Sequence, residues 1–140
     1  MPFVLDASVV LAWHFRDEDS VLAERVSERS YRDRVVVPQH WALEVSSALL
    51  RGERRLRSDL SDVDLFIERL RALDLETDSL SPEQVYSAVL PIARRHRLSV
   101  YDAAYLELSQ RLELQLATLD TSVTAVARRL GVHLIEESGG

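Results

Sequence analysis

Residues 1–15 read MPFVLDASVVLAWHF, and this stretch indicates how the chain begins to fold. The apolar run Phe3–Leu5 leads directly into Asp6, and small residues after it lead into a second apolar run. A short apolar run of this kind is typical of a buried strand. We therefore expect Asp6 at the end of a buried strand. Its carboxylate has two interpretations, as the cap of the next helix or as a metal ligand.

The same alternation of apolar runs and helical patterns continues along the chain. The expected strands lie at residues 3–5, 34–38, 73–77, 114–119 and 132–135. The expected helices lie at residues 20–31, 39–51, 62–73, from Ser81 onward, 99–112 and 121–130, the last ended by Gly131. Strands that alternate with helices indicate a parallel sheet covered on both faces. The sequence thus predicts an α/β fold, a single three-layer α/β/α domain with a five-stranded parallel sheet.

The composition is that of one globular domain. The chain has 140 residues, 46% of them hydrophobic, which is enough for a substantial core. No apolar run reaches the roughly 18 residues that cross a bilayer, and no secretory signal precedes the first strand. Because cysteine is absent, disulfides and thiol-based sites are excluded. We expect a cytoplasmic protein without a membrane partner, with one domain over residues 1–136 and a flexible tail at 137–140.

The charge distribution bears on the class of partner. The formal net charge is −6, which argues against a broad nucleic-acid-binding surface. The 17 basic residues are all arginine, and they cluster at residues 51–57 and 94–97. An arginine side chain can donate two hydrogen bonds to one phosphate. The absence of lysine excludes any mechanism that requires one.

Three aspartates occupy the places where ligands bind in parallel sheets, beyond the carboxyl ends of the strands. Asp6 follows the first expected strand, and Asp120 follows the fourth in LATLDTSV. Asp102 lies three residues after Ser99, in the first turn of an expected helix. Each of the three also has a purely structural interpretation, because carboxylates at helix N-termini are favourable.

Glu44 needs a different explanation. It lies beside an apolar stripe formed by Trp41, Val45, Ala48 and Leu49, where it has no capping role. Burial of an unpaired carboxylate would cost several kcal/mol or force it to take up a proton. Glu44 therefore needs a partner, and an arginine, a hydrogen-bond network and a cation are all open.

The four acids together favour a metal site. If they converge, they repel one another strongly unless a divalent cation lies among them. Ligands that are all oxygen, without a histidine or cysteine cluster, favour Mg²⁺ or Mn²⁺. Such a site can activate water and stabilise the charge that develops in phosphoryl transfer.

Four motifs, taken in order, resemble the PIN domain, in particular the VapC-type toxin ribonucleases of bacterial type II toxin–antitoxin pairs. The motifs are VLDASVVLAW, ALEVSSALLR, SVYDAAYLELS and ATLDTSVTAVARRLGV, and the resemblance covers essentially the whole chain. It implies a five-stranded parallel sheet between helices and an acidic pocket for Mg²⁺ or Mn²⁺. It also implies an endoribonuclease that hydrolyses phosphodiester bonds in single-stranded or looped RNA.

The resemblance carries over to individual residues of this sequence. It implies catalytic and metal-binding roles for the four acids, Asp6, Glu44, Asp102 and Asp120. Ser8 and Thr118 match positions where the family places supporting hydroxyl groups. The implied nucleophile is a water molecule. Because no histidine pair is available to act on the 2′-hydroxyl, we expect 5′-phosphate and 3′-hydroxyl products. The arginines that could contact RNA phosphates are Arg54, Arg55, Arg94 and Arg95, although a solvated helix face is the better explanation for each of them.

Partners and competing functions follow from the same residues. The resemblance implies a homodimer and a VapB-type antitoxin whose C-terminal segment lies in a groove, giving a toxin–antitoxin hetero-oligomer. An alternative function is a non-catalytic interaction module whose acidic pocket binds a partner's arginine. Phosphatases and dehalogenases with an aspartate nucleophile, and phospho-receiver domains, are disfavoured. The second position of their D-x-D motif is Ser8 here, and the lysine they use is absent.

We interpret the remaining polar and aromatic residues as structural rather than functional. The histidines, His14, His40, His96 and His133, show no metal-ligand spacing. Tyr101 and Tyr105 are four residues apart on one expected helix face, and we interpret them as packing residues.

Overall fold

Four parallel strands form the central sheet of the computed structural model, which describes residues 1–15 and 20–137. They are β1 (Phe3–Leu5), β2 (Val35–Pro38), β3 (Leu75–Asp78) and β4 (Gln115–Ala117), in the order β3-β2-β1-β4. Every neighbouring pair is parallel, and Val4 is in register with Val36 on one side and Leu116 on the other. The expected parallel α/β architecture is confirmed.

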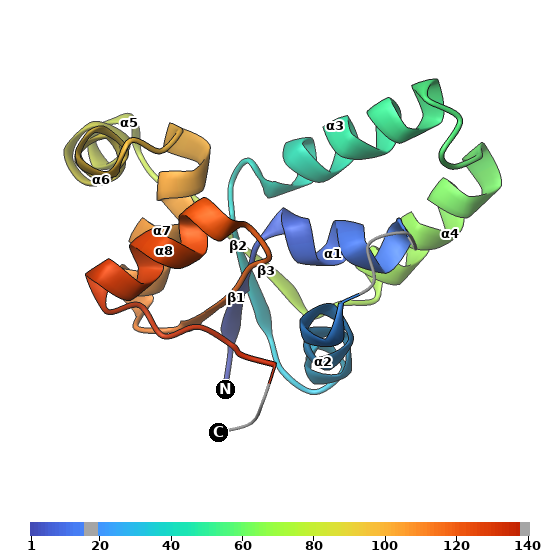
Figure 1. The fold of residues 1–140 in the computed structure, drawn as a ribbon, viewed down its shortest axis with the longest axis horizontal. Coiled ribbons are helices and arrows are strands. Elements are labelled where there is room, and N and C mark those ends of the chain that lie inside the picture. Colours follow the sequence, from blue (N-terminus) through green and yellow to red (C-terminus); the bar gives the residue numbers. More distant parts are fainter. Residues whose placement is uncertain (16–19, 138–140) are drawn as a thin grey trace.

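Helices cover both faces of this sheet, as Figure 1 shows. On one side lie α1 (Ala7–His14), α2 (Val21–Ser30), α3 (Trp41–Arg54) and α4 (Leu60–Arg71). On the other side lie α5 (Pro82–Gln84), the π-helix η1 (Val85–Val89), α6 (Leu90–His96), α7 (Val100–Leu112) and α8 (Thr121–Leu130). None of the helices in the described parts of the chain is long and apolar enough to span a membrane.

The prediction of a fifth strand at residues 132–135 is wrong. Within the described residues, the segment 132–135 forms only an isolated bridge between Leu134 and Leu116. Two hydrogen bonds hold it, from the Leu116 N–H to the His133 carbonyl at 2.8 Å and from the Ile135 N–H to the Leu116 carbonyl at 3.0 Å. Val132 and Ile135 are buried in the core, so side-chain packing adds to these two hydrogen bonds in place of a continuous ladder. Of the predicted tail, residues 138–140 lie outside the described residues.

The core explains why these segments form the sheet. All three residues of β1 are fully buried, and the four residues of β2 are buried as well. Strands buried on both faces read as continuous apolar runs, which is the pattern that Phe3–Leu5 and Val35–Val37 show. The edge strand β3 is exposed and polar. The central position of β1 places the residue that follows it, Asp6, in the middle of the sheet's carboxyl edge.

The helix predicted from Ser81 onward begins as expected but is interrupted. The Ser81 hydroxyl accepts a hydrogen bond from the Gln84 N–H at 3.2 Å, and Gln84 Oε1 accepts one from the Ser81 N–H at 2.8 Å. The chain then widens into η1 just before Pro91. A proline inside a helix lacks an N–H and crowds the carbonyl four residues earlier, and a π-turn relieves this conflict.

Candidate functional site

Asp6 lies at the carboxyl end of β1 and caps α1. Its Oδ2 accepts hydrogen bonds from the hydroxyls of Thr118 at 2.5 Å and Ser8 at 3.0 Å, while Oδ1 accepts a longer one from the Ser8 N–H at 3.4 Å. Burial, with a smaller contribution from the Glu44 carboxylate, raises the pKa of Asp6 to about 6 against the opposing effect of the Thr118 hydrogen bond. Asp6 therefore caps α1, and its Oδ1, which accepts only the long Ser8 hydrogen bond, is less engaged than Oδ2.

Two hydroxyl groups connect Asp6 to the end of the neighbouring strand β4. Thr118 Oγ1, besides donating to Asp6, accepts a hydrogen bond from the Asp120 N–H at 3.1 Å. Ser8 Oγ accepts one from the Leu119 N–H at 3.0 Å. Asp120 caps α8 through its Oδ1. Because β1 and β4 are adjacent and parallel, their carboxyl ends bring Asp6, Ser8, Thr118 and Asp120 together.

Glu44 is held by a tyrosine and a histidine rather than by an arginine. The Tyr105 hydroxyl donates a hydrogen bond to Glu44 Oε1 at 2.7 Å and accepts one from the Ala7 N–H at 3.3 Å. His40 Nε2 lies 3.0 Å from the same Glu44 oxygen, at ion-pair distance but without the geometry of a hydrogen bond. Burial and the nearby carboxylates of Asp6 and Glu44 raise the pKa of Tyr105 far above its ordinary value, so its hydroxyl remains a donor.

Asp102 joins this group from the first turn of α7. Its N–H donates to the Ser99 hydroxyl at 3.1 Å, as the capping pattern predicts. Burial raises the pKa of Asp102, and the carboxylates of Asp120 and Glu44 raise it further. The Tyr105 hydroxyl shows where the starts of α1, α3 and α7 meet, because it joins the Ala7 N–H to Glu44. Figure 1 shows α1, α3 and α8 beginning at the same end of the sheet.

The donor set suits a hard divalent cation, although the side chains are not gathered around one. Among the described residues, no three histidine, aspartate or glutamate side chains lie close enough together to hold a metal ion as they stand. The available ligands are carboxylate oxygens, which Mg²⁺ and Mn²⁺ prefer. Burial is the main cause of the raised pKa values of Asp6 and Asp102, and neighbouring carboxylates add to it. A bound cation would favour the charged form of both carboxylates.

Sequence reasoning missed Tyr105 and His40. Tyr105 is fully buried, as expected of a packing residue, but its hydroxyl is the link between Glu44 and the start of α1. Its position three residues after Asp102 placed it on the same face of α7, and that spacing was an available signal. His40 follows β2 and is four residues before Glu44, which is also a helix-neighbour spacing.

The four arginines proposed for RNA contact lie at the ends of two helices. Arg54 and Arg55 lie at the end of α3, and Arg94 and Arg95 lie near the end of α6, all of them exposed. The two helices lie on opposite sides of the sheet (Figure 1). The fold therefore leaves these arginines as two separate exposed pairs.

Residues 3–129 match the family model of the PIN domain. The chain is 30% identical over 122 residues to ribonuclease VapC3 of Pyrobaculum aerophilum, covering 86% of this chain and 90% of that protein. A crystal structure of PAE2754 from Pyrobaculum aerophilum has a TM-score of 0.71 at 20% identity, covering 96% of this chain and 83% of that one. VapBC2 from Rickettsia felis, bound to a DNA fragment from its promoter, has a TM-score of 0.63 at 12% identity, covering 96% and 98%.

Proposed function

This chain belongs to the PIN-domain family, and on that premise we propose that it is a metal-dependent endoribonuclease, the toxin of a VapBC-type toxin–antitoxin pair. The observation that carries the proposal is the placement of Asp6 and Asp120 after the ends of the adjacent parallel strands β1 and β4, where the Ser8 and Thr118 hydroxyls connect them. Glu44 is connected to the start of α1 through the Tyr105 hydroxyl. The similarity in sequence to ribonuclease VapC3 supports the same activity. Carboxylates that repel one another in a partly buried site are a typical arrangement for binding a catalytic cation.

Asp6, Glu44, Asp102 and Asp120 would hold the cation, Mg²⁺ or Mn²⁺. When bound, such an ion would neutralise charge on the phosphate and lower the pKa of water, so that hydroxide is available near neutral pH to attack phosphorus. Cleavage by water would leave 5′-phosphate and 3′-hydroxyl ends on the RNA.

Neighbouring residues orient these carboxylates. Ser8 and Thr118 both donate to Oδ2 of Asp6, which turns the less engaged Oδ1 toward a ligand. The Tyr105 hydroxyl and the His40 ring hold Oε1 of Glu44 and leave Oε2 for a ligand. Residues that fix ligand orientation in this way commonly change metal affinity by about 10–100-fold when they are removed.

The RNA substrate and the antitoxin would use exposed parts of the helices around this site. Arg54, Arg55, Arg94 and Arg95 are available for phosphate contacts. Leucines on α3 and α4 are unusually exposed for a water-soluble domain, namely Leu43 at 76%, Leu50 at 44%, Leu60 at 70% and Leu65 at 71%. Exposed apolar side chains on two consecutive helices support a partner-binding surface, for a VapB-type antitoxin segment or a second copy of the chain.

A second candidate function is an interaction module whose acidic pocket receives an arginine from a partner. It is favoured by one observation, the separation of the acidic side chains within the described residues. A guanidinium spans carboxylates that are too far apart to share one ion.

Cleavage of end-labelled total RNA tests the proposal. Antitoxin-free protein is incubated with Mg²⁺, with Mn²⁺ or with EDTA, beside the variants Asp6→Asn and Asp102→Asn. We expect discrete fragments with either metal and none with EDTA. Each variant should lose roughly 100-fold or more in rate, because it removes a charged ligand.

Asp64→Asn is the matched control, because it makes the same change at an exposed position of α4. It should cleave like the wild type. If folded wild-type protein leaves several RNA pools intact with both metals, the nuclease proposal fails and the arginine-binding module becomes the better explanation.

A further inference from the structure

A small apolar pocket adjoins the acidic edge of the sheet, beyond the carboxyl ends of β2 and β3. Its volume is about 120 Å³. Residues from the loop after β2, the loop after β3, η1 and the first turns of α7 line it. The residues that matter here are Gln39, His40, Leu80, Val89, Tyr101 and Ala104.

The walls of this pocket suit a flat aromatic ring. Val89 and Ala104 belong to a small second core that is separate from the main one, and they form an apolar floor. Tyr101 remains 59% exposed and Val100 39% exposed, so the pocket opens to solvent beside an aromatic ring. At about 120 Å³ the pocket is smaller than an apolar cavity of about 150 Å³ that encloses a benzene ring, so it can receive the edge of one ring while the rest of that ring stays at the open mouth.

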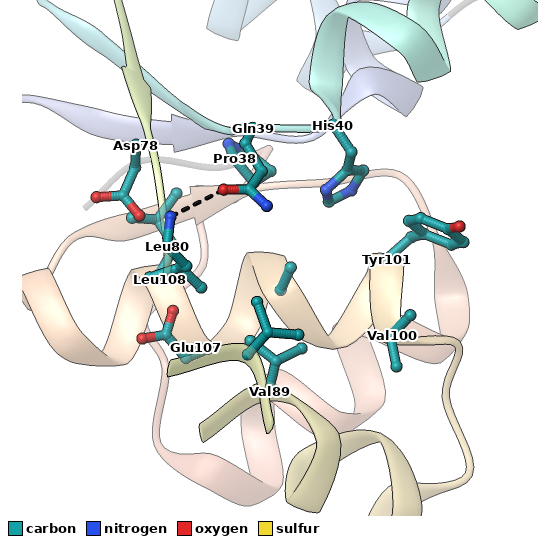
Figure 2. A pocket seen from close by; sticks show the side chains of 12 residues that line it. Pro38, Gln39, His40, Asp78, Leu80, Val89, Val100, Tyr101, Glu107 and Leu108 are labelled. Atoms are coloured by element: carbon teal, nitrogen blue, oxygen red, sulfur yellow. Dashed lines mark hydrogen bonds between the residues drawn. The ribbon is translucent and has the colours of Figure 1, made fainter. Parts of the chain in front are cut away.

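The pocket adjoins the acidic site through His40. His40 lines the pocket, and its Nε2 lies 3.0 Å from Glu44 Oε1. Tyr101 lines it too and directly precedes Asp102. The two rings contact each other with centroids 5.3 Å apart, and Figure 2 shows them together at one side of the pocket. A nucleic-acid chain with one phosphate at the carboxylates would therefore carry an adjoining base to the mouth of this pocket.

Gln39 supplies a fixed hydrogen-bond donor. Its Oε1 accepts a hydrogen bond from the Leu80 N–H at 2.8 Å, and because that N–H can only donate, the amide oxygen must face it. The amide nitrogen therefore faces the other way, and Figure 2 shows it turned toward the space between Leu80 and His40. Ring nitrogens and carbonyl oxygens of nucleobases accept hydrogen bonds from such a donor.

The two carboxylates at the pocket do not make it a cation site. Glu107 Oε1 accepts a hydrogen bond from Arg111 Nε at 2.7 Å, and Asp78 Oδ2 accepts one from Arg111 Nη2 at 2.5 Å. These ion pairs raise the pKa of Arg111 and engage both acids, leaving one net negative charge on the three side chains. The rest of the pocket is mainly apolar, with the Gln39 amide donor and the aromatic edge of Tyr101.

We propose that this pocket binds a single nucleobase of the RNA next to the scissile phosphate and so sets the base preference of cleavage. The inference deepens the proposed nuclease function and rests on it. Apolar walls that contact both faces of the ring give affinity, and the Gln39 amide discriminates among bases by the acceptor that each presents.

Cleavage of a random-sequence single-stranded RNA pool, with sequencing of the new 5′ ends, tests this. The wild type should prefer one base at a fixed position beside the cut. Gln39→Leu removes the donor and Ala104→Leu narrows the slot, so each should weaken that preference by about tenfold. Cleavage of RNAs without the preferred base should change little.

Two controls make the same chemical changes elsewhere. Gln110→Leu alters an exposed glutamine at the far end of α7, and Ala125→Leu alters an exposed alanine on α8. Both should keep the wild-type preference. If both pocket variants also keep it, or if the wild type prefers no base beside the cut, the proposal is overturned. An apolar side chain of a protein partner then becomes the better occupant.

A binding measurement in EDTA separates this proposal from the nuclease function. Each of the four nucleoside 5′-monophosphates is titrated into the wild type, and the methyl NMR signals of Val89 and Ala104 are followed. We expect at least one nucleotide to shift them saturably, and Ala104→Leu to abolish the effect at Val89. Such shifts without any RNA cleavage would support the base pocket and reject the nuclease. The absence of shifts with every nucleotide would overturn the pocket, whether or not RNA is cut.

Discussion

A single hydroxyl group, that of Tyr105, connects parts of the site that are distant in the sequence. It donates to Glu44 in α3 and accepts from the Ala7 N–H at the start of α1, although it belongs to α7. Tyr105 contacts no substrate in the proposed mechanism, so it is a positioning residue. Its effect on the reaction would come through the orientation of Glu44 and of the segment that carries Asp6.

Tyr105→Phe should therefore affect both stability and catalysis. Loss of the hydroxyl leaves the buried Ala7 N–H without a partner, which costs about 1–3 kcal/mol in free energy of unfolding. Reorientation of Glu44 should raise the Mg²⁺ concentration needed for half-maximal cleavage by about tenfold while KM for RNA stays unchanged.

Urea unfolding and metal titrations of the cleavage rate measure the two effects. Tyr86→Phe is the control, because Tyr86 is 63% exposed on η1. A stability loss without any change in the metal requirement would show that Tyr105 is structural only.

At the scale of elements, the close approach of α3 to the end of α1 depends on Gly52. A Cβ atom at this position would lie 2.7 Å from Cε1 and Cζ of Phe15. Phe15 is itself buried, and the Arg57 guanidinium lies over its ring at 4.4 Å. The glycine thus allows the last turn of α3 to pack against Phe15.

Gly52→Ala should destabilise the protein in spite of the better helix propensity of alanine. The propensity gain is about 1 kcal/mol, whereas overpacking of a filled core costs about 1–3 kcal/mol. We expect a net loss of about 1 kcal/mol in urea unfolding. In combination with Phe15→Leu, which removes the two ring atoms, the same substitution should become neutral or stabilising. An equal loss in both backgrounds would contradict the proposed contact.

At the scale of the whole molecule, the fold buries an acid at the carboxyl edge of the sheet, and the free energy of unfolding therefore depends on pH. Burial raises the pKa of Asp6 from 3.8 to about 6, so the folded state binds this proton more tightly than the unfolded chain does. The resulting stabilisation is complete below pH 3.8 and is lost as the pH rises through about 6. The pKa values of Asp33 and Asp59 are lowered, so the stability that these two groups contribute is lost as the pH falls.

Comparison of the wild type with Asp6→Asn isolates the Asp6 contribution. In EDTA, the variant should gain about 2 kcal/mol relative to the wild type between pH 4.5 and pH 8, because only the wild type must bury a charge. Urea unfolding at both pH values measures this gain. Mg²⁺ at pH 8 should restore stability to the wild type but not to the variant, by preferential binding to the folded state. A pH-independent difference between the two proteins would contradict the raised pKa of Asp6.

The sequence by itself determined the parallel α/β fold and the order of its elements. The continuous apolar runs of β1 and β2 are typical of strands that are buried on both faces of a sheet. The apolar stripe of α3 was also predicted residue by residue. The caps at Asp6, Ser81, Ser99 and Asp120 are local interactions, so local sequence was enough to predict them. The same locality explains why the candidate acids could be named from their positions after strands and at helix starts.

Only the tertiary structure decided which side chains meet. The hydroxyl of Thr118 reaches Asp6 across 112 positions of sequence, and Tyr105 reaches Glu44 across 61. The short edge at residues 132–135 likewise depends on packing against β4 rather than on its own apolar pattern. Such contacts are set by strand order and helix packing, whereas a propensity or a periodicity describes only neighbours in the chain. For this reason the contact of Tyr105 with Glu44 and the pocket beside His40 became evident only from the tertiary structure.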